Sequence, residues 1–229
     1  MDFWKEFWKK YRHLVPVAVY MIFYMSVFTY VENRTGVRLH LLSSRYDRLI
    51  PFCELFIIPY FMWFFYVAAG VLYVGIREQE RRQYYLLITN LSIGMTLFLV
   101  ISLLWPNGHT LRPATFSRDN IFTDMVRGLY LTDTSTNVFP SIHVFNSIAI
   151  HTAVAKCESL RKHPVIVRGS LILCILIIAS TLFLKQHTIV DVLGAFVLNF
   201  ATYHLVYQPK LQAQNAHSRY RRNHLFYRK

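Results

Sequence analysis

The chain has 229 residues, of which 54% are hydrophobic and 16% aromatic, and its formal charge is +13 at pH 7. Long apolar runs recur along its whole length, which excludes an ordinary soluble domain and indicates that a bilayer is the solvent. The charge does not indicate a nucleic-acid-binding protein, because the basic residues form clusters between the apolar runs rather than a separate basic domain.

Six apolar runs are each long enough to cross a bilayer, at about 20 residues a span. They use nearly the whole length, so the sequence predicts an all-α, polytopic membrane protein with a single domain over residues 1–229. The first run resembles the core of a signal peptide, but its length and the lack of a small-x-small cleavage site favour a retained span. In chain order the predicted transmembrane helices are 14–31, 51–76, 84–105, 139–155, 164–184 and 187–207.

Three segments outside these spans have a clear character. Residues 1–13 combine basic residues with Trp4 and Trp8, as in a segment that lies against anionic lipid headgroups. The longest polar stretch, 106–138, is expected to contain a short amphipathic helix near 120–130. Residues 208–229 form a basic tail, for which we expect no catalytic role.

The distribution of lysine and arginine predicts the orientation. Seventeen of them lie in the two termini and in the connections after spans two and four, whereas eight lie in the other three connections. Basic residues favour the cytoplasmic side, so both termini are expected in the cytoplasm. The sequence thus predicts a multi-pass protein of the cell membrane whose connections after spans one, three and five face outward.

One motif at the outer surface opens the fourth span, with Pro140, Ser141 and His143. Proline suits the first position of a helix, where its missing N–H would be unpaired in any case. The N–H groups of Ser141 and Ile142 would then be free donors at the positive end of a helix dipole, which is an anion site. A helix start with a merely packed histidine would give the same pattern.

A second motif lies at the start of the sixth span, where His187 and Asp191 are four residues apart. On a helix, Asp191 can accept a hydrogen bond from one ring nitrogen of His187 and direct the other toward a substrate. The same spacing could chelate a metal. However, no glutamate or third histidine lies at ligand spacing nearby, and Arg112 and Lys185 would repel a cation, so we expect no metal.

Taken together, the motifs resemble those of the type-2 phosphatidic acid phosphatase superfamily. That family carries K-x6-R-P, then P-S-x-H, then S-R-x5-H-x3-D. The chain matches R-P at Arg112, P-S-x-H at Pro140 to His143, and S-x6-H-x3-D from Ser180 to Asp191. It is also similar to the branch with inositol phosphorylceramide synthases and, through the HTIVDV run at 187–192, to sphingomyelin synthases.

The resemblance implies a site at the extracytoplasmic face that uses neither metal nor cofactor. His187 would attack phosphorus to form a phosphohistidine, Asp191 would orient it, and His143 would protonate the leaving oxygen. The phosphoryl oxygens would be held by a second group of residues: Arg112, Ser141, Ser180 and Lys185.

Two basic positions of the family pattern are missing. The lysine expected seven residues before Arg112 is Trp105, and the arginine expected after Ser180 is Thr181. Lys185 lies one helical turn beyond Thr181, so its ammonium would reach the same space if the fifth span stays helical that far. These departures weaken the case for a doubly charged substrate.

The resemblance implies an integral membrane lipid phosphatase, a phosphoric ester hydrolase whose partners are the bilayer and a phospholipid or lipid phosphate. The alternative is a phosphodiester headgroup transferase or a phospholipase-C-like enzyme, in which a lipid hydroxyl or water takes up the phosphoryl group. A transporter is a remote alternative, because no internal repeat is visible and the reactive residues crowd one interface.

Overall fold

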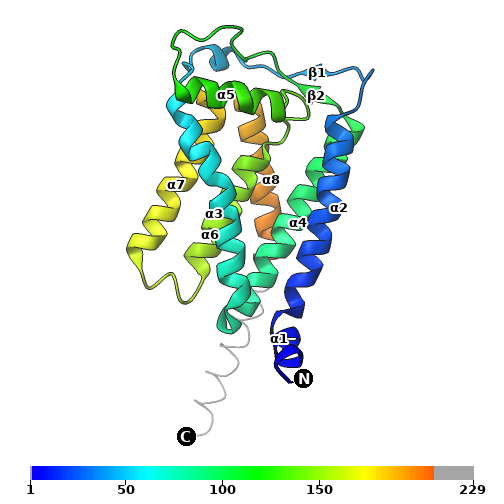
Figure 1. The fold of residues 1–229 in the computed structure, drawn as a ribbon, viewed down its shortest axis with the longest axis vertical. Coiled ribbons are helices and arrows are strands. Elements are labelled where there is room, and N and C mark those ends of the chain that lie inside the picture. Colours follow the sequence, from blue (N-terminus) through cyan, green and yellow to red (C-terminus); the bar gives the residue numbers. More distant parts are fainter. Residues whose placement is uncertain (1, 209–229) are drawn as a thin grey trace, which may run out of the picture.

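The computed structural model describes residues 2–208, which form a bundle of helices that run side by side (Figure 1). The predicted basic tail therefore lies outside the described residues, apart from its first position. Five helical stretches are long and apolar enough to cross a membrane, so a helical protein with several spans is confirmed. They are built on α2 (Val15–Glu32), α3 (Ile57–Ile76), α4 (Arg81–Leu104), α7 (Pro164–Phe183) and α8 (Ile189–Val206).

The second span begins later than predicted. Residues 51–56 were expected to be part of it, but they form a bend and the short helix η3 (Glu54–Phe56) before α3 begins at Ile57. The N–H of Cys53 donates to the carbonyl of Phe183 at 3.1 Å. This bend therefore attaches the start of α3 to the end of α7, beside the turn that carries His187.

The predicted fourth span corresponds to α6 (Ile142–Lys156), which is the central helix of the bundle and packs against α3, α4, α7 and α8. Its side chains Val144, Phe145 and Ala149 are fully buried. With 15 residues, it is about 22 Å long, which is shorter than a hydrocarbon core of about 30 Å. A sixth complete span therefore remains a prediction.

Glycines allow two of the contacts around α6. A Cβ atom at Gly94 of α4 would lie 2.1 Å from the ring of Phe145. A Cβ atom at Gly194 of α8 would lie 2.3 Å from the ring of Phe139, just before α6. The two aromatic rings thus fill the space left by the missing side chains, and they fix the start of α6 against α4 and α8.

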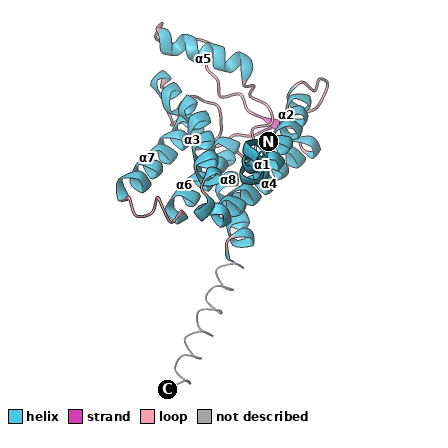
Figure 2. Ribbon diagram, turned by 60° about the horizontal axis from the view of Figure 1, so that its bottom comes forward, coloured by secondary structure: helices cyan, strands magenta, loops and turns pink. Residues whose placement is uncertain are grey.

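A layer of loops and one helix covers one end of the bundle (Figure 1). Its helix is α5 (Ile121–Thr132), which confirms the amphipathic helix predicted near 120–130. Asn120 begins α5 by accepting the N–H groups of Phe122 and Thr123. The layer also contains a two-residue parallel pairing of β1 (His40–Leu41) with β2 (Asn107–Gly108), and the short helix η2 (Arg45–Arg48). Figure 2 shows α5 apart from the membrane-crossing helices.

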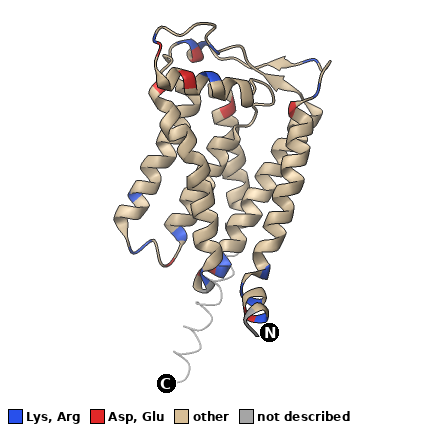
Figure 3. Ribbon diagram, viewed as in Figure 1, with Lys and Arg blue, Asp and Glu red and all other residues tan. Residues whose placement is uncertain are grey.

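Charge differs between the two ends of the bundle (Figure 3). The opposite end carries α1 (Asp2–Tyr11), the short helices η1 (Arg12–Leu14) and η4 (Glu78–Glu80), and the connection between α6 and α7. Within the described residues, that end has eleven Lys and Arg against five Asp and Glu, and the α5 end has eight against seven. The excess of positive charge thus lies at the end with α1.

Candidate active site

The structure brings the two histidines of the separate motifs together. His143 lies in the first turn of α6, and His187 lies just before α8. Their ring centroids are 5.7 Å apart, and both side chains line one cavity of about 320 Å³. The arrangement follows from a backbone contact, because the N–H of Ser141 donates to the carbonyl of Asp191 at 3.1 Å and joins the starts of α6 and α8.

Asp191 lies beside His187, as its spacing predicted. The distance from Nδ1 of His187 to Oδ2 of Asp191 is 3.6 Å, longer than a hydrogen bond. Oδ2 instead accepts the N–H of Thr188 at 2.6 Å, as part of the cap that begins α8. Nδ1 of His187 and Oδ1 of Asp191 have no partner among the described residues. Catalytic hydrogen bonds are often this long before a substrate tightens the site.

The ring of His143 is held between two aromatic side chains of α3. Its centroid lies 4.6 Å from that of Tyr60 and 4.4 Å from that of Trp63. Both aromatic residues also line the cavity. These walls limit the positions that the imidazole can take and shield it from solvent.

Ser141 and Ser180 do not take the positions expected for phosphate ligands. The N–H of Ser141 was predicted to be free, but it is bonded to Asp191, and the Ser141 hydroxyl accepts the N–H of Val144 at 3.4 Å as the cap of α6. The Ser180 hydroxyl donates to the carbonyl of Ile177 at 2.7 Å within α7. Both serines are fully buried, and neither is among the residues that line the cavity.

Arg112 lies close to the site, but most of its donors are engaged. Its terminal nitrogens donate to the carbonyls of Tyr130 and Asp133, at 3.0 and 2.5 Å, and to the side-chain oxygen of Gln186. The guanidinium also stacks on the ring of Tyr130 at 4.4 Å. Arg112 therefore connects the end of α5 to the turn before His187, and its buried Nε–H remains without a partner among the described residues.

Lys185 points away from the cavity. The condition for Lys185 to reach the site is not met, because α7 ends at Phe183, one residue before the predicted end of the span, and Lys185 has a left-handed backbone with φ of 55°. Its ammonium donates to the carbonyls of Asp47 and Ile50 at 2.8 and 2.5 Å. Burial lowers the pKa of this ammonium, while the charge of Asp47 opposes that shift. In this position Lys185 anchors the 45–50 segment over the turn and cannot replace the missing arginine.

Two carboxylates line the same cavity, and the motifs gave no signal for either. Glu32, in the last turn of α2, accepts the hydroxyl of Thr134 at 2.5 Å and the amide of Asn137 at 3.1 Å. Asp133, just after α5, accepts the hydroxyl of Tyr60 through Oδ2. Acidic residues at span ends are usually interfacial charges, so only the folded arrangement distinguishes this pair.

Two buried polar residues organise the loop that leads into α6. The side-chain oxygen of Asn107 accepts the N–H groups of both Val138 and Phe139 at 2.9 Å. His109 donates from Nε2 to the carbonyl of Gln186 at 2.8 Å, and its Nδ1 accepts the N–H of Leu111 at 3.2 Å. Neither position stands out in the sequence, because a loop asparagine or histidine is most often a surface residue.

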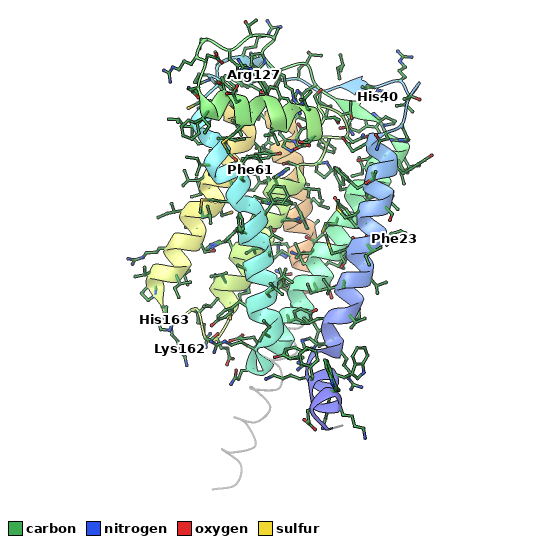
Figure 4. All side chains as sticks on the ribbon, in the orientation of Figure 1. Phe23, His40, Phe61, Arg127, Lys162 and His163 are labelled. Carbon is green, nitrogen blue, oxygen red and sulfur yellow. The ribbon has the colours of Figure 1, made fainter. Side chains whose placement is uncertain are left out.

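The cavity divides into a polar and an apolar part. The polar part holds the two histidines, the two carboxylates, Gln186 and Asn137, whereas half of the remaining lining residues are aromatic. One of these is Phe61 of α3, which lies near the α5 end of the bundle (Figure 4). Met25 of α2 and Phe64 of α3 also line the cavity, and they are 49% and 55% exposed. The apolar part thus reaches the outer surface between α2 and α3.

Among residues 2–208, no group of three or more His, Cys, Asp or Glu side chains is placed to hold a metal ion. No family model matches the chain, and no curated protein or solved structure compared with it is a significant match. Membership of the type-2 phosphatidic acid phosphatase superfamily therefore remains a prediction that rests on the three motifs.

Proposed function

We propose that the protein is an integral membrane enzyme that breaks a phosphorus–oxygen bond in a lipid, with His187 as nucleophile and His143 as proton donor. One observation carries the proposal: two imidazoles from separate motifs meet at the polar end of a cavity whose aromatic end reaches the lipid-facing surface. A phospholipid has the same division, with a phosphate at one end and acyl chains at the other.

The geometry suggests a two-step reaction. In the first step, Nε2 of His187 attacks phosphorus, the bond to the leaving oxygen breaks, and a protonated His143 gives that oxygen its proton. Asp191, 3.6 Å from Nδ1 of His187, stabilises the positive charge that forms on the ring. In the second step, His143 takes a proton from water or from a lipid hydroxyl, whose oxygen attacks phosphorus and releases His187.

By resemblance, the first candidate substrate is a phosphate monoester, so the enzyme would be a lipid phosphatase. A specific observation favours a second candidate, a phosphodiester lipid that loses or exchanges its headgroup. The cavity is lined by two carboxylates and by no lysine or arginine of the described residues. A monoester with nearly two negative charges fits such surroundings less well than a diester with one.

The test compares phosphate release with headgroup release by purified protein on matched monoester and diester lipids. We expect turnover on at least one class, and we expect His187→Ala to lower it at least about 1,000-fold while the protein stays folded. A folded His187→Ala variant with near-normal turnover would contradict the proposal.

The site is proposed to lie at the extracytoplasmic face of the cell membrane. The support is the excess of positive charge at the end with α1, opposite the end where the two histidines lie.

A further inference from the structure

We propose that the end of the bundle with α1 contains a second site, which binds a phosphate group and is separate from the candidate active site. The site is a cavity of about 590 Å³ between the start of α4, the connection from α6 to α7 and the end of α8. Cavities of this volume are typical of small-molecule sites. The inference does not depend on the proposed reaction, because no residue lines both cavities.

The lining of this second cavity carries more positive than negative charge. Three cationic side chains line it, Arg82, Lys156 and Arg161, together with two carboxylates, Glu80 and Glu158. Two carboxylates do not make a metal site, and no group of three metal-binding side chains occurs within residues 2–208. The balance of charge therefore favours an anionic ligand.

Glu80 holds one wall of the cavity in place. It is only 2% exposed, and its two carboxylate oxygens accept the N–H groups of Ser159 at 2.8 Å and Glu158 at 3.1 Å. These hydrogen bonds attach the connection after α6 to the start of α4. The charge of Glu80 is thus directed to the backbone of this connection, while the connection carries Lys156 and Arg161 to the cavity.

Two of the cationic groups have no anionic partner. The ammonium of Lys156, which is half-buried, lies over the rings of Tyr203 and Tyr207, 5.2 and 5.9 Å from their centroids. Neither Lys156 nor Arg161 forms an ion pair with any residue that the structure describes. Removing a charge from water without a partner costs free energy. An anionic ligand would supply the partner.

An independent observation concerns the hydroxyl group of Tyr207. Tyr207 lines the cavity and is only 2% exposed. Its oxygen accepts the side-chain N–H of Gln83 at 3.4 Å, and no acceptor for its own hydrogen occurs among the described residues. Buried tyrosine hydroxyls usually have such an acceptor. A phosphate group has enough acceptor oxygens to bind this hydroxyl together with Lys156 and Arg161.

The position of the cavity fits a ligand at the membrane surface. Both α4 and α8 are long and apolar enough to cross a bilayer, so their ends lie at the depth of the lipid headgroups. This end also carries the excess of positive charge (Figure 3). Basic pockets between the ends of membrane-crossing helices bind the phosphates of anionic lipids. A soluble phosphate shares this chemistry, and binding assays with both ligands separate the two sources.

The test measures affinity by titrating the unfolding temperature of the purified full-length protein in a neutral detergent. The His187→Ala background blocks the proposed reaction, so the probes stay intact. The probes are dioctanoyl phosphatidic acid and inorganic phosphate, with dioctanoyl phosphatidylcholine as a reference without net charge. We expect at least one phosphate probe to bind more tightly than the reference, and Lys156→Gln to weaken that binding about tenfold. Lys156→Arg should restore most of it.

Three further variants test the argument from charge. Arg161→Gln should weaken binding by about threefold or more, a smaller effect because Arg161 is exposed. Lys162→Gln is the matched control, because Lys162 is the next residue on the same connection (Figure 4) and does not line the cavity. This variant should keep the affinity of the background protein. Glu158→Gln should strengthen binding, because it removes a repelling carboxylate from the lining.

The two probes identify the source of the phosphate group. Binding that depends on Lys156 and occurs with phosphatidic acid alone assigns the site to a lipid headgroup, whereas such binding with inorganic phosphate assigns it to a soluble phosphate. If Lys156→Gln and Arg161→Gln weaken binding of neither probe more than Lys162→Gln does, the site is wrong. Failure of the wild type to cleave lipids would contradict the proposed function and leave this result unchanged.

Discussion

His143 and His187 have different roles in the proposed reaction. Substrates that differ in the basicity of their leaving oxygen can distinguish the two roles. General acid catalysis is needed when the leaving oxygen is strongly basic, as in an alkyl ester, but not when it leaves as a stable anion. The two rings lie 5.7 Å apart, so both can contact one phosphate group.

We expect His143→Gln to lower turnover of an alkyl phosphate ester by about 100-fold or more, and to affect a p-nitrophenyl ester far less. His187→Ala should abolish both, because the nucleophile is needed whatever the leaving group. Steady-state kinetics on the two esters measure this. His151→Gln is the control, since His151 contacts Ser170 in α7 and does not line the cavity. Equal losses on both esters for His143→Gln would rule out its role as proton donor.

A second prediction at the level of single residues concerns His109 and the dependence of stability on pH. In the fold, Nε2 donates and Nδ1 accepts, so the ring must be neutral. Burial lowers the pKa of His109, which the hydrogen bond to Gln186 partly opposes. The unfolded chain takes up a proton near pH 6.5, at about the ordinary pKa, while the folded ring does not. Stability should therefore fall as the pH drops below that value.

The measurement is the unfolding temperature in detergent between pH 7.5 and 5. The His109→Asn variant, which can still donate to Gln186, should lose less stability on acidification than the wild type. An unchanged pH dependence in the variant would show that His109 is not the group responsible.

At the level of elements, apolar run length predicted most of the helices, because five stretches are apolar on nearly every face. The ends were harder to predict. Pro140 was expected at the first helical position, but α6 begins at Ile142 and Ser141 is its cap, because the Ser141 hydroxyl accepts the N–H of Val144. The end of α7 lies within one residue of the prediction, but the direction of the Lys185 side chain could not be predicted, because its ammonium donates to the carbonyl of Asp47, far away in the sequence.

Gly94 provides a test of how closely α4 and α6 pack. We expect Gly94→Ala to destabilise the protein by about 1–3 kcal/mol, because the new methyl group would overlap the ring of Phe145. Gly169→Ala in α7 is the control, since a Cβ atom there meets nothing within 4 Å and alanine favours a helix. Unfolding in detergent measures both variants. Equal stability of the two would mean that α4 can move away from α6 at little cost.

At the scale of the whole molecule, the proposed orientation places the end with α5 outside the cell. Thr110 and Lys162 are both exposed and lie at opposite ends of the bundle. In a background without the three native cysteines, we expect Thr110→Cys to react with an impermeant maleimide on intact cells, and Lys162→Cys to react only after lysis. The reverse pattern would invert the topology.

The cavity is the part of the site that could not be predicted from the sequence. The motifs pointed to His143, His187 and Asp191 because their spacings are short and local. Glu32 and Asp133 lie on different elements, about a hundred positions apart, and they share a cavity only because the loop after α5 folds back to α2 through Thr134. Such a contact depends on tertiary packing and leaves no periodic signal in the chain.

If the protein acts as proposed, the exposed aromatic end of the cavity between α2 and α3 has a consequence for kinetics. A lipid that arrives there diffuses within a leaflet, so the concentration that matters is its mole fraction in that surface and not its amount per volume of solution. The rate would then fall when an inert amphiphile dilutes the substrate at constant total lipid. A cleaved diacyl product would leave by the same route and remain in the bilayer, where it would compete with fresh substrate.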